Sequence, residues 1–119
     1  VMVSGGDASL YYIPGCAEVT SDIRKRLDGA MLALFDGTLW QDDEMIREGL
    51  GSKTGRRMGH VSMSGPEGSI ARLKDVAIGR RVFIHINNTN PVLIEDSPER
   101  REAEEAGWEI AFDGMEIPL

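Results

Sequence analysis

Two apolar segments of the chain end abruptly in polar residues. The first covers residues 30–35 and ends at Asp36; the second begins at residue 82, contains His85 and is followed by a run of asparagines. Neither segment alternates between apolar and polar positions, which is typical of strands buried on both faces. Because layered α/β folds build their sites where strands end, we expect Asp36 and His85 to converge at the exits of neighbouring strands.

The rest of the pattern predicts helices alternating with strands, and therefore one α/β layered domain over residues 1–119. Further strands are expected at residues 9–13, 108–112 and 115–117, and a loop at residues 49–66. Helices are expected to begin at capping residues or acidic first turns, namely at Thr20 or Ser21, at residues 42–44, at a capping box formed by Ser64 and Glu67, and at Ser97 followed by Pro98.

Composition narrows the classes of function. A net charge of −7 argues against a nucleic-acid groove spread over the surface. No apolar run approaches the length of about 20 residues that a membrane-spanning helix needs. Cys16 is the single cysteine, so a disulfide framework or a cysteine zinc site within the chain is excluded. The first residues lack the features of a signal peptide, and we expect a cytoplasmic protein. They lead straight into a strand pattern, as if the chain began within a longer protein.

Asp36, His85 and, as a third candidate, His60 are the residues suited to binding a metal. Imidazole and carboxylate together suit zinc or non-haem iron, and a complete site needs three or more protein ligands. Each residue also has a structural interpretation. Asp36 begins an Asp-Gly-Thr turn in which its carboxylate would cap backbone amides, and a single histidine is often only a hydrogen-bonded residue.

A basic loop stands out in this acidic chain. Residues 51–57 carry Lys53, Arg56 and Arg57 among glycines, without the spacing of a phosphate-binding Walker loop. Three cations beside exposed glycine amides suit an anionic substrate, and the alternative is a solvated, mobile loop. We expect residues 51–58 to be mobile without ligand and to gain order with a polycarboxylate.

Taken together, several segments resemble the pyrroloquinoline quinone (PQQ) biosynthesis protein B family of the metallo-β-lactamase superfamily. The resemblance rests on residues 34–40, 54–60, 83–91, 95–100 and 107–116 and covers essentially the whole chain. It implies the carboxy-terminal half of an αββα sandwich, in which the amino-terminal half would carry the superfamily's H-x-H-x-D-H motif. The missing half, or a second copy of the chain, would then cover the second face of the sheet.

The resemblance also implies roles for individual residues. Asp36 matches an aspartate that contacts the metals, and His85 matches the last ligand histidine. His60 resembles a non-ligand histidine near the substrate and is assigned a catalytic role. A divalent metal, iron or zinc, is implied, with a site that this part of the chain leaves incomplete and inactive by itself. The substrate-binding candidates are Lys53, Arg56, Arg57, Asn87 and Asn88.

The function implied by the resemblance is a step in PQQ biosynthesis. The preferred interpretation is a metal-dependent oxygenation or hydroxylation of the peptide-derived glutamate–tyrosine precursor. An alternative is a protein that carries or helps export PQQ or its precursor without chemistry, and a simple hydrolase ranks third. Precursor and product are both polycarboxylates, which suits the cations of the basic loop.

Overall fold

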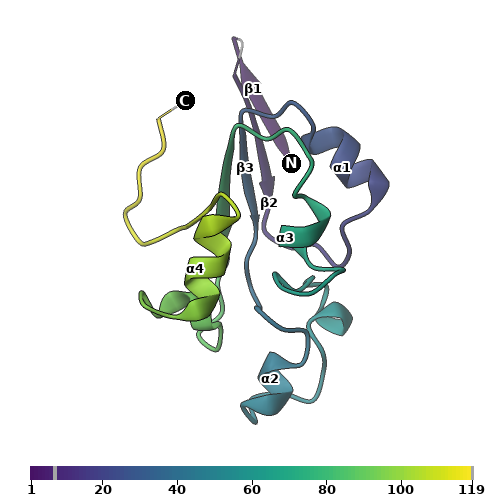
Figure 1. Ribbon diagram of the computed structural model, residues 1–119. Coiled ribbons are helices and arrows are strands. Elements are labelled where there is room, and N and C mark those ends of the chain that lie inside the picture. The colour runs from purple at the N-terminus through teal and green to yellow at the C-terminus, as the bar shows by residue number, and fades with distance from the viewer. Residues whose placement is uncertain (7, 119) are drawn as a thin grey trace.

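The computed structural model describes residues 1–6 and 8–118, which form a five-stranded sheet (Figure 1). The strands, in the order in which they pair, are β1 (Met2–Gly5), β2 (Ala8–Ile13), β3 (Leu32–Asp36), β4 (Arg80–Ile84) and β5 (Trp108–Ile110). β1 and β2 are antiparallel, and the other three pairs are parallel. Each parallel connection carries a helix, as such crossovers usually do. The predicted α/β layered architecture is therefore confirmed.

The helices are short, and the two longest, α1 (Ser21–Leu27) and α4 (Pro98–Glu105), begin at a side-chain cap. The others are α2 (Glu44–Arg47) and α3 (Ser69–Arg72), with 3-10 turns η1 (Arg56–Met58) and η2 (Pro91–Leu93). Thr20 accepts a hydrogen bond from the backbone N–H of Ile23, and Ser97 accepts one from that of Arg100. Both predicted caps are confirmed, because each hydroxyl satisfies an amide that the helix itself leaves free.

The predicted capping box at Ser64 and Glu67 is wrong. Helix α3 begins only at Ser69, and its N-cap is Gly68, which makes no side-chain cap. The Ser64 hydroxyl instead donates to the backbone carbonyl of Trp40, 2.6 Å away. The Ser64 hydroxyl therefore bonds to a residue distant in sequence, Trp40, and not to a backbone amide of the helix as the local motif predicts.

The strand predicted at residues 115–117 is also wrong. β5 ends at Ile110, and residues 115–118 have no regular structure. A strand is stabilised by hydrogen bonds to a neighbour, and Figure 1 shows this yellow segment running apart from the sheet. Without a pairing partner, its alternating pattern does not produce a strand.

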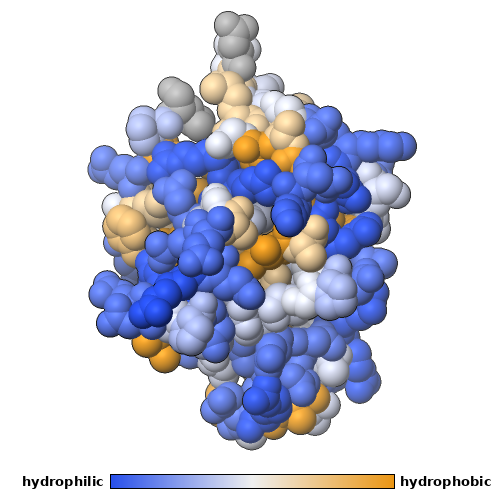
Figure 2. All heavy atoms as spheres, in the orientation of Figure 1, coloured by the Kyte–Doolittle hydropathy of each residue, from blue (hydrophilic) through white to orange (hydrophobic). Residues whose placement is uncertain are grey.

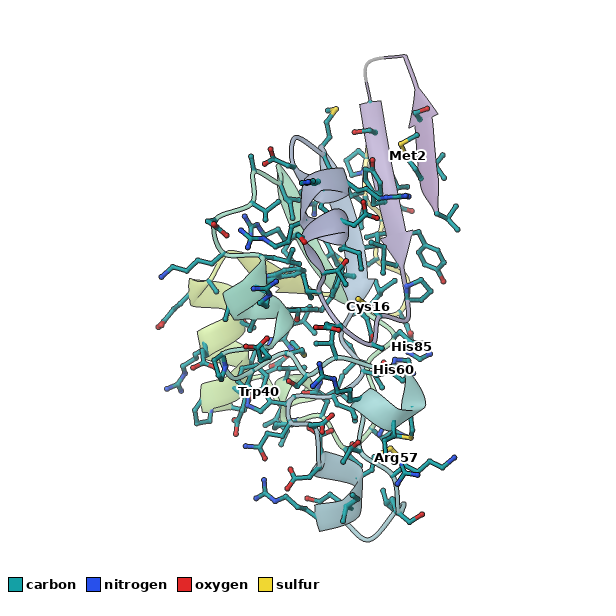
Figure 3. All side chains as sticks on the ribbon, turned by 90° about the vertical axis from the view of Figure 1, so that its right-hand side faces the viewer. Met2, Cys16, Trp40, Arg57, His60 and His85 are labelled. Carbon is teal, nitrogen blue, oxygen red and sulfur yellow. The ribbon has the colours of Figure 1, made fainter. Side chains whose placement is uncertain are left out.

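The hydrophobic core lies between the helices and one face of the sheet. On this face Phe83 stacks on Trp108, with ring centroids 3.9 Å apart, and Phe35 meets Trp108 edge-on at 6.2 Å. Leu27 of α1 and Ala103 of α4 are fully buried in the same cluster. Figures 1 and 3 show the helices gathered on this side, and Figure 2 shows that their outer surface is mainly hydrophilic.

The opposite face of the sheet is apolar as well. Leu10, Leu34 and Ile84 are half-buried there, and Tyr12 is 45% exposed. Within the described part of the chain, none of these four side chains belongs to the core cluster. The prediction that the central strands carry apolar residues on both faces is confirmed, and helices cover only one of those faces.

We expect the 119-residue chain, produced alone, to self-associate or to bind a dye that reports exposed apolar surface, because monomers rarely leave such a face in water. Size-exclusion chromatography with dye fluorescence measures both. Replacing Leu34 and Ile84 with threonine should reduce the signal, whereas Ile46→Thr, at an exposed position of α2, should not. A compact monomer without dye binding would show that this face needs no cover.

Candidate metal centre

The carboxyl ends of β3 and β4 bring the two predicted metal ligands together. Asp36 is the last residue of β3, and it pairs with Ile84, the last residue of β4, so His85 follows at the same edge. One ligand-type atom from each of Asp36, His60 and His85 lies within 4.8 Å of the others. The predicted convergence of Asp36 and His85 is confirmed, and His60 joins them.

Asp36 is fully buried, and its carboxylate has four hydrogen-bond contacts. Oδ2 accepts from the backbone N–H of Cys16 at 3.0 Å and lies 2.9 Å from Nδ1 of His60. Oδ1 accepts from the backbone N–H of Thr38 at 3.0 Å and from its hydroxyl at 2.6 Å. The turn interpretation of Asp36 therefore holds together with the cluster, since the same carboxylate caps backbone amides and faces a histidine.

The loop between α2 and α3 returns His60 to the strand ends. Leu39 and Ser62 form a parallel bridge, and the His60 N–H donates to the Gly55 carbonyl at 2.8 Å. Gly55 is needed at this close approach, because a Cβ there would lie 2.5 Å from Leu39 Cδ1 and 2.9 Å from the His60 carbonyl oxygen. These contacts place the His60 ring beside that of His85, stacked with centroids 5.3 Å apart.

His85 has an unusual backbone conformation at the exposed side of the cluster. Its φ is +57°, a region that non-glycine residues rarely adopt and that often marks functional positions. The ring is exposed, and its Nδ1 lies 2.8 Å from the Thr38 hydroxyl. An exposed imidazole at the end of a buried strand is accessible to ligands from solvent.

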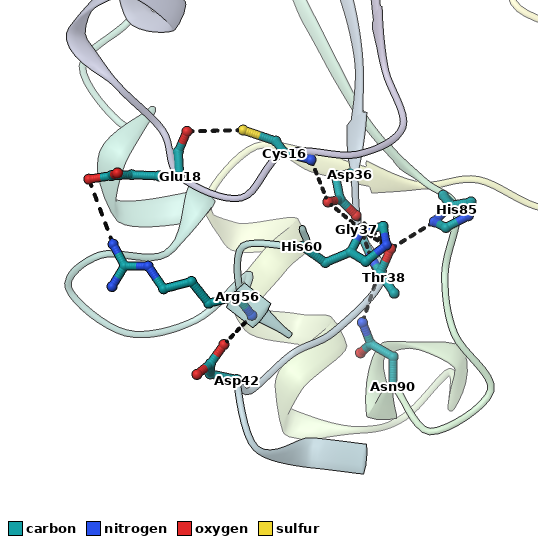
Figure 4. A network of polar contacts seen from close by, with 10 residues as sticks. All are labelled: Cys16, Glu18, Asp36, Gly37, Thr38, Asp42, Arg56, His60, His85 and Asn90. Atoms are coloured by element: carbon teal, nitrogen blue, oxygen red, sulfur yellow. Dashed lines mark hydrogen bonds and ion pairs between the residues drawn. The ribbon is translucent and has the colours of Figure 1, made fainter. Parts of the chain in front are cut away.

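Thr38 is a site residue that the sequence did not single out. Its hydroxyl lies within hydrogen-bond distance of all three cluster residues, Asp36, His60 and His85 (Figure 4). The one signal in the sequence is its place two residues after Asp36 in a turn. That spacing predicts a contact with Asp36 but not with two histidines that are distant in sequence.

Cys16 touches the cluster through its backbone only. Burial raises the pKa of its thiol, and the nearby Asp36 charge raises it further. The thiol donates to the Glu18 carbonyl at 3.2 Å, and Figure 4 shows it pointing away from the histidines. A protonated thiol in this orientation is not a metal ligand, which agrees with the sequence-based exclusion of a cysteine site.

The basic loop lies next to His60 along the chain, but the structure does not bring every cation to the cluster. Lys53, Arg56 and Arg57 are all exposed. The Arg56 guanidinium lies 3.7 Å from Glu18, on the far side of His60 from His85 (Figure 4). The substrate-binding role and the mobility of this loop stay predictions.

The two candidate asparagines differ in their surroundings. Asn87 is half-buried; its backbone N–H donates to the Thr38 carbonyl at 3.0 Å, and its side chain donates to Thr89 at 2.7 Å. Asn88 is exposed. Asn90, which the sequence did not single out, is buried and donates to the Gly37 carbonyl at 2.9 Å. Asn87 and Asn90 thus support the turn that carries Thr38, and substrate contact by Asn87 or Asn88 stays a prediction.

An open hollow of about 640 Å³ lies beside His85. Its wall is partly apolar, with the exposed ring of Phe112, and partly charged, with Arg100 and the two acids Glu95 and Asp113. A small amphipathic molecule in this hollow would contact the exposed imidazole.

Comparison with known proteins places this geometry in a family. A family model described as "Beta-lactamase superfamily domain" matches residues 1–86. The chain belongs to the beta-lactamase superfamily. The match includes β1 to β4 and all three residues of the cluster, so the strand ends described above are those of a superfamily domain.

The chain is also similar to proteins named "Coenzyme PQQ synthesis protein B". That from Methylorubrum extorquens (strain PA1) is 60% identical over 118 residues, which are 99% of this chain and 40% of that protein. That from Bradyrhizobium diazoefficiens is 61% identical over 109 residues, 92% of this chain and 35% of that protein. The resemblance found in the sequence is therefore confirmed, and the chain spans about 40% of the length of these relatives.

A crystal structure of Zn²⁺-bound PqqB from Methylobacterium extorquens has the same fold. Its TM-score is 0.96 at 59% identity, and the match covers 99% of this chain and 42% of that one. The predicted fold class, part of a metallo-β-lactamase fold, is thereby confirmed. Among the residues that the structure describes, no helix is long and apolar enough to cross a membrane.

Proposed function

We propose that this chain is part of a metal-dependent enzyme of PQQ biosynthesis, which oxygenates or hydroxylates the glutamate–tyrosine-derived precursor. The observation that carries the proposal is the convergence of Asp36, His60 and His85 in a chain about 60% identical to PQQ synthesis proteins. Neither a carboxylate with two imidazoles nor a shared name would suffice alone. Together they support a metal centre that acts on a molecule of PQQ biosynthesis.

The residues present fit a divalent metal. One carboxylate and two imidazoles are the donor set of non-haem iron oxygenase sites, and the same donors also suit catalytic zinc. Asp36 and His85 would hold the ion, and His60 would either complete the set or move a proton beside it. A bound ion would supply Lewis-acid or redox chemistry. Asp36 would exchange one of its four hydrogen bonds for the metal.

The chain's own residues would then orient the substrate. The precursor is a polycarboxylate, and guanidinium groups bind carboxylates through paired hydrogen bonds. Lys53, Arg56 and Arg57 would contribute this charge from the loop that leads to His60, and Asn87 and Asn88 would contribute amide groups from the segment that follows His85. The hollow beside His85 would take the ring portion of the molecule.

Replacing Arg56 and Arg57 with alanine should weaken binding of PQQ or its precursor about tenfold or more, a loss of about 1.4 kcal/mol. Isothermal titration of a full-length protein that contains this chain measures the effect. Arg26→Ala with Arg101→Ala removes the same charge at exposed positions of α1 and α4 and should leave affinity unchanged. If the loop variant and the control variant bind PQQ with the same affinity, and also bind the precursor with the same affinity, the basic loop is not part of the substrate site.

Turnover under oxygen separates the enzyme from a carrier. The full-length protein is freed of metal, reloaded with Fe²⁺ or Zn²⁺ and incubated with precursor, O₂ and a two-electron reductant, which reduces the second oxygen atom to water. The products are analysed by mass spectrometry. An added oxygen atom that requires metal and Asp36 supports the enzyme. Tight, metal-independent binding without any product would instead support a protein that carries PQQ or its precursor.

A further inference from the structure

We propose that the Thr38 hydroxyl is a positioning group that fixes both histidine rings of the cluster with their Nδ1–H toward it. Each ring then keeps Nε2 as its unprotonated nitrogen, ready for a metal ion. The inference rests on the metal centre of the proposed function and adds a residue that neither the sequence motifs nor a ligand count identifies. Thr38 itself is not proposed as a ligand.

The argument starts from the number of hydrogen bonds that one hydroxyl can make. Thr38 Oγ1 lies 2.6 Å from Asp36 Oδ1, 2.8 Å from His85 Nδ1 and 3.1 Å from His60 Nδ1. A hydroxyl offers one proton and two lone pairs, so three partners use it completely. The shortest contact has the length of an O–H···O⁻ bond, so the proton is donated to Asp36.

The remaining two contacts follow from that donation. Having given its proton to Asp36, the hydroxyl can only accept, so His60 and His85 must both donate from Nδ1. For His60 a second observation agrees, because its Nδ1 also lies 2.9 Å from Asp36 Oδ2, another acceptor. A neutral imidazole carries one proton, which leaves Nε2 with a free lone pair in each ring. Metal-binding histidines are usually fixed by such a bond from their other nitrogen.

Burial and backbone geometry explain why the hydroxyl matters most for His85. Thr38 is 7% exposed, so water does not easily replace it, whereas the His85 ring is exposed. Among the described contacts, Thr38 is the one hydrogen-bond partner of the His85 side chain. Without it, that ring would be free to turn, while His60 would keep its bond to Asp36.

Two variants isolate the hydroxyl. Thr38→Val keeps the shape and the backbone N–H that bonds Asp36, but removes the hydroxyl. Thr38→Ser keeps the hydroxyl and removes only a methyl group. Zn²⁺ affinity is measured in a full-length protein that contains this chain, by competition with a chelating dye. Protonation of the ring nitrogens is read in the metal-free protein at one fixed pH from ¹⁵N-histidine NMR spectra.

We expect Thr38→Val to weaken Zn²⁺ binding about 10- to 100-fold, the usual effect of losing such a partner, and Thr38→Ser to restore it. In the wild type both rings should carry Nδ1–H, and His85 should lose this preference in Thr38→Val. Unchanged affinity and ring protonation in Thr38→Val, or Nε2–H on both rings of the wild type, would overturn the proposal. If His85→Ala leaves Zn²⁺ affinity unchanged, the metal centre itself fails, and the NMR result still decides the role of Thr38.

Discussion

Replacing Gly37 with alanine is expected to cost about 3 kcal/mol of unfolding free energy, as overpacking of a rigid site does. A Cβ at Gly37 would lie 2.8 Å from the Cβ of Phe83 and 3.1 Å from the carbonyl oxygen of Ile84. Both belong to the centre of the sheet, so neither neighbour can rotate away. The Gly37 N–H also donates to that carbonyl at 2.8 Å, and this bond would lengthen.

The same change should disturb the cluster. Gly37 joins Asp36 to Thr38, so moving its backbone away from β4 separates both from His85. Urea unfolding measures the stability, and Zn²⁺ affinity reports on the cluster. Gly5→Ala is the matched control, because a Cβ there meets nothing within 4 Å. Equal stabilities of the two variants would mean that Gly37 and β4 do not approach as closely as described.

The cluster could be predicted from sequence only where its residues sit at strand ends. Asp36 and His85 each follow a continuous apolar segment, and parallel strands deliver their carboxyl ends to one edge of the sheet. The two residues therefore converge without knowledge of any loop. The caps at Thr20 and Ser97 could also be predicted from sequence, because a cap depends on contacts within one helical turn.

His60 and Thr38 depend on contacts that no local pattern contains. His60 reaches the strand ends because Gly55 allows a close backbone approach and Leu39 bridges to Ser62. Only then does the Thr38 hydroxyl gain two histidine partners, 22 and 47 residues away in sequence. The prediction of a capping box at Ser64 was wrong for the same reason, because the Ser64 hydroxyl donates to the distant Trp40 carbonyl.

Asp36→Asn is expected to lower Zn²⁺ affinity about 100-fold or more. Losing a residue that only supports a metal ligand already lowers metal affinity about 10- to 100-fold, and a ligand should matter at least as much. The same substitution should also destabilise the metal-free protein. The second effect arises because asparagine replaces one carboxylate oxygen with an NH₂ donor. On one side that group would face the N–H of Cys16 and the His60 ring, and on the other the N–H of Thr38. In either orientation of the asparagine side chain, its NH₂ group would face a buried backbone N–H, and neither donor would have an acceptor.

An unsatisfied buried polar group lowers the unfolding free energy by about 1–3 kcal/mol. We expect a loss of this size for Asp36→Asn when unfolding is measured with a chelator present to keep the protein free of metal. Asp75→Asn makes the same chemical change at the surface, where Asp75 pairs with Arg24 at 2.7 Å and its side chain is 73% exposed. An exposed pair of this kind contributes about 1 kcal/mol or less, so the control should remain close to wild type in both measurements. If Asp36→Asn binds Zn²⁺ as tightly as Asp75→Asn, Asp36 is not a ligand and serves the turn alone.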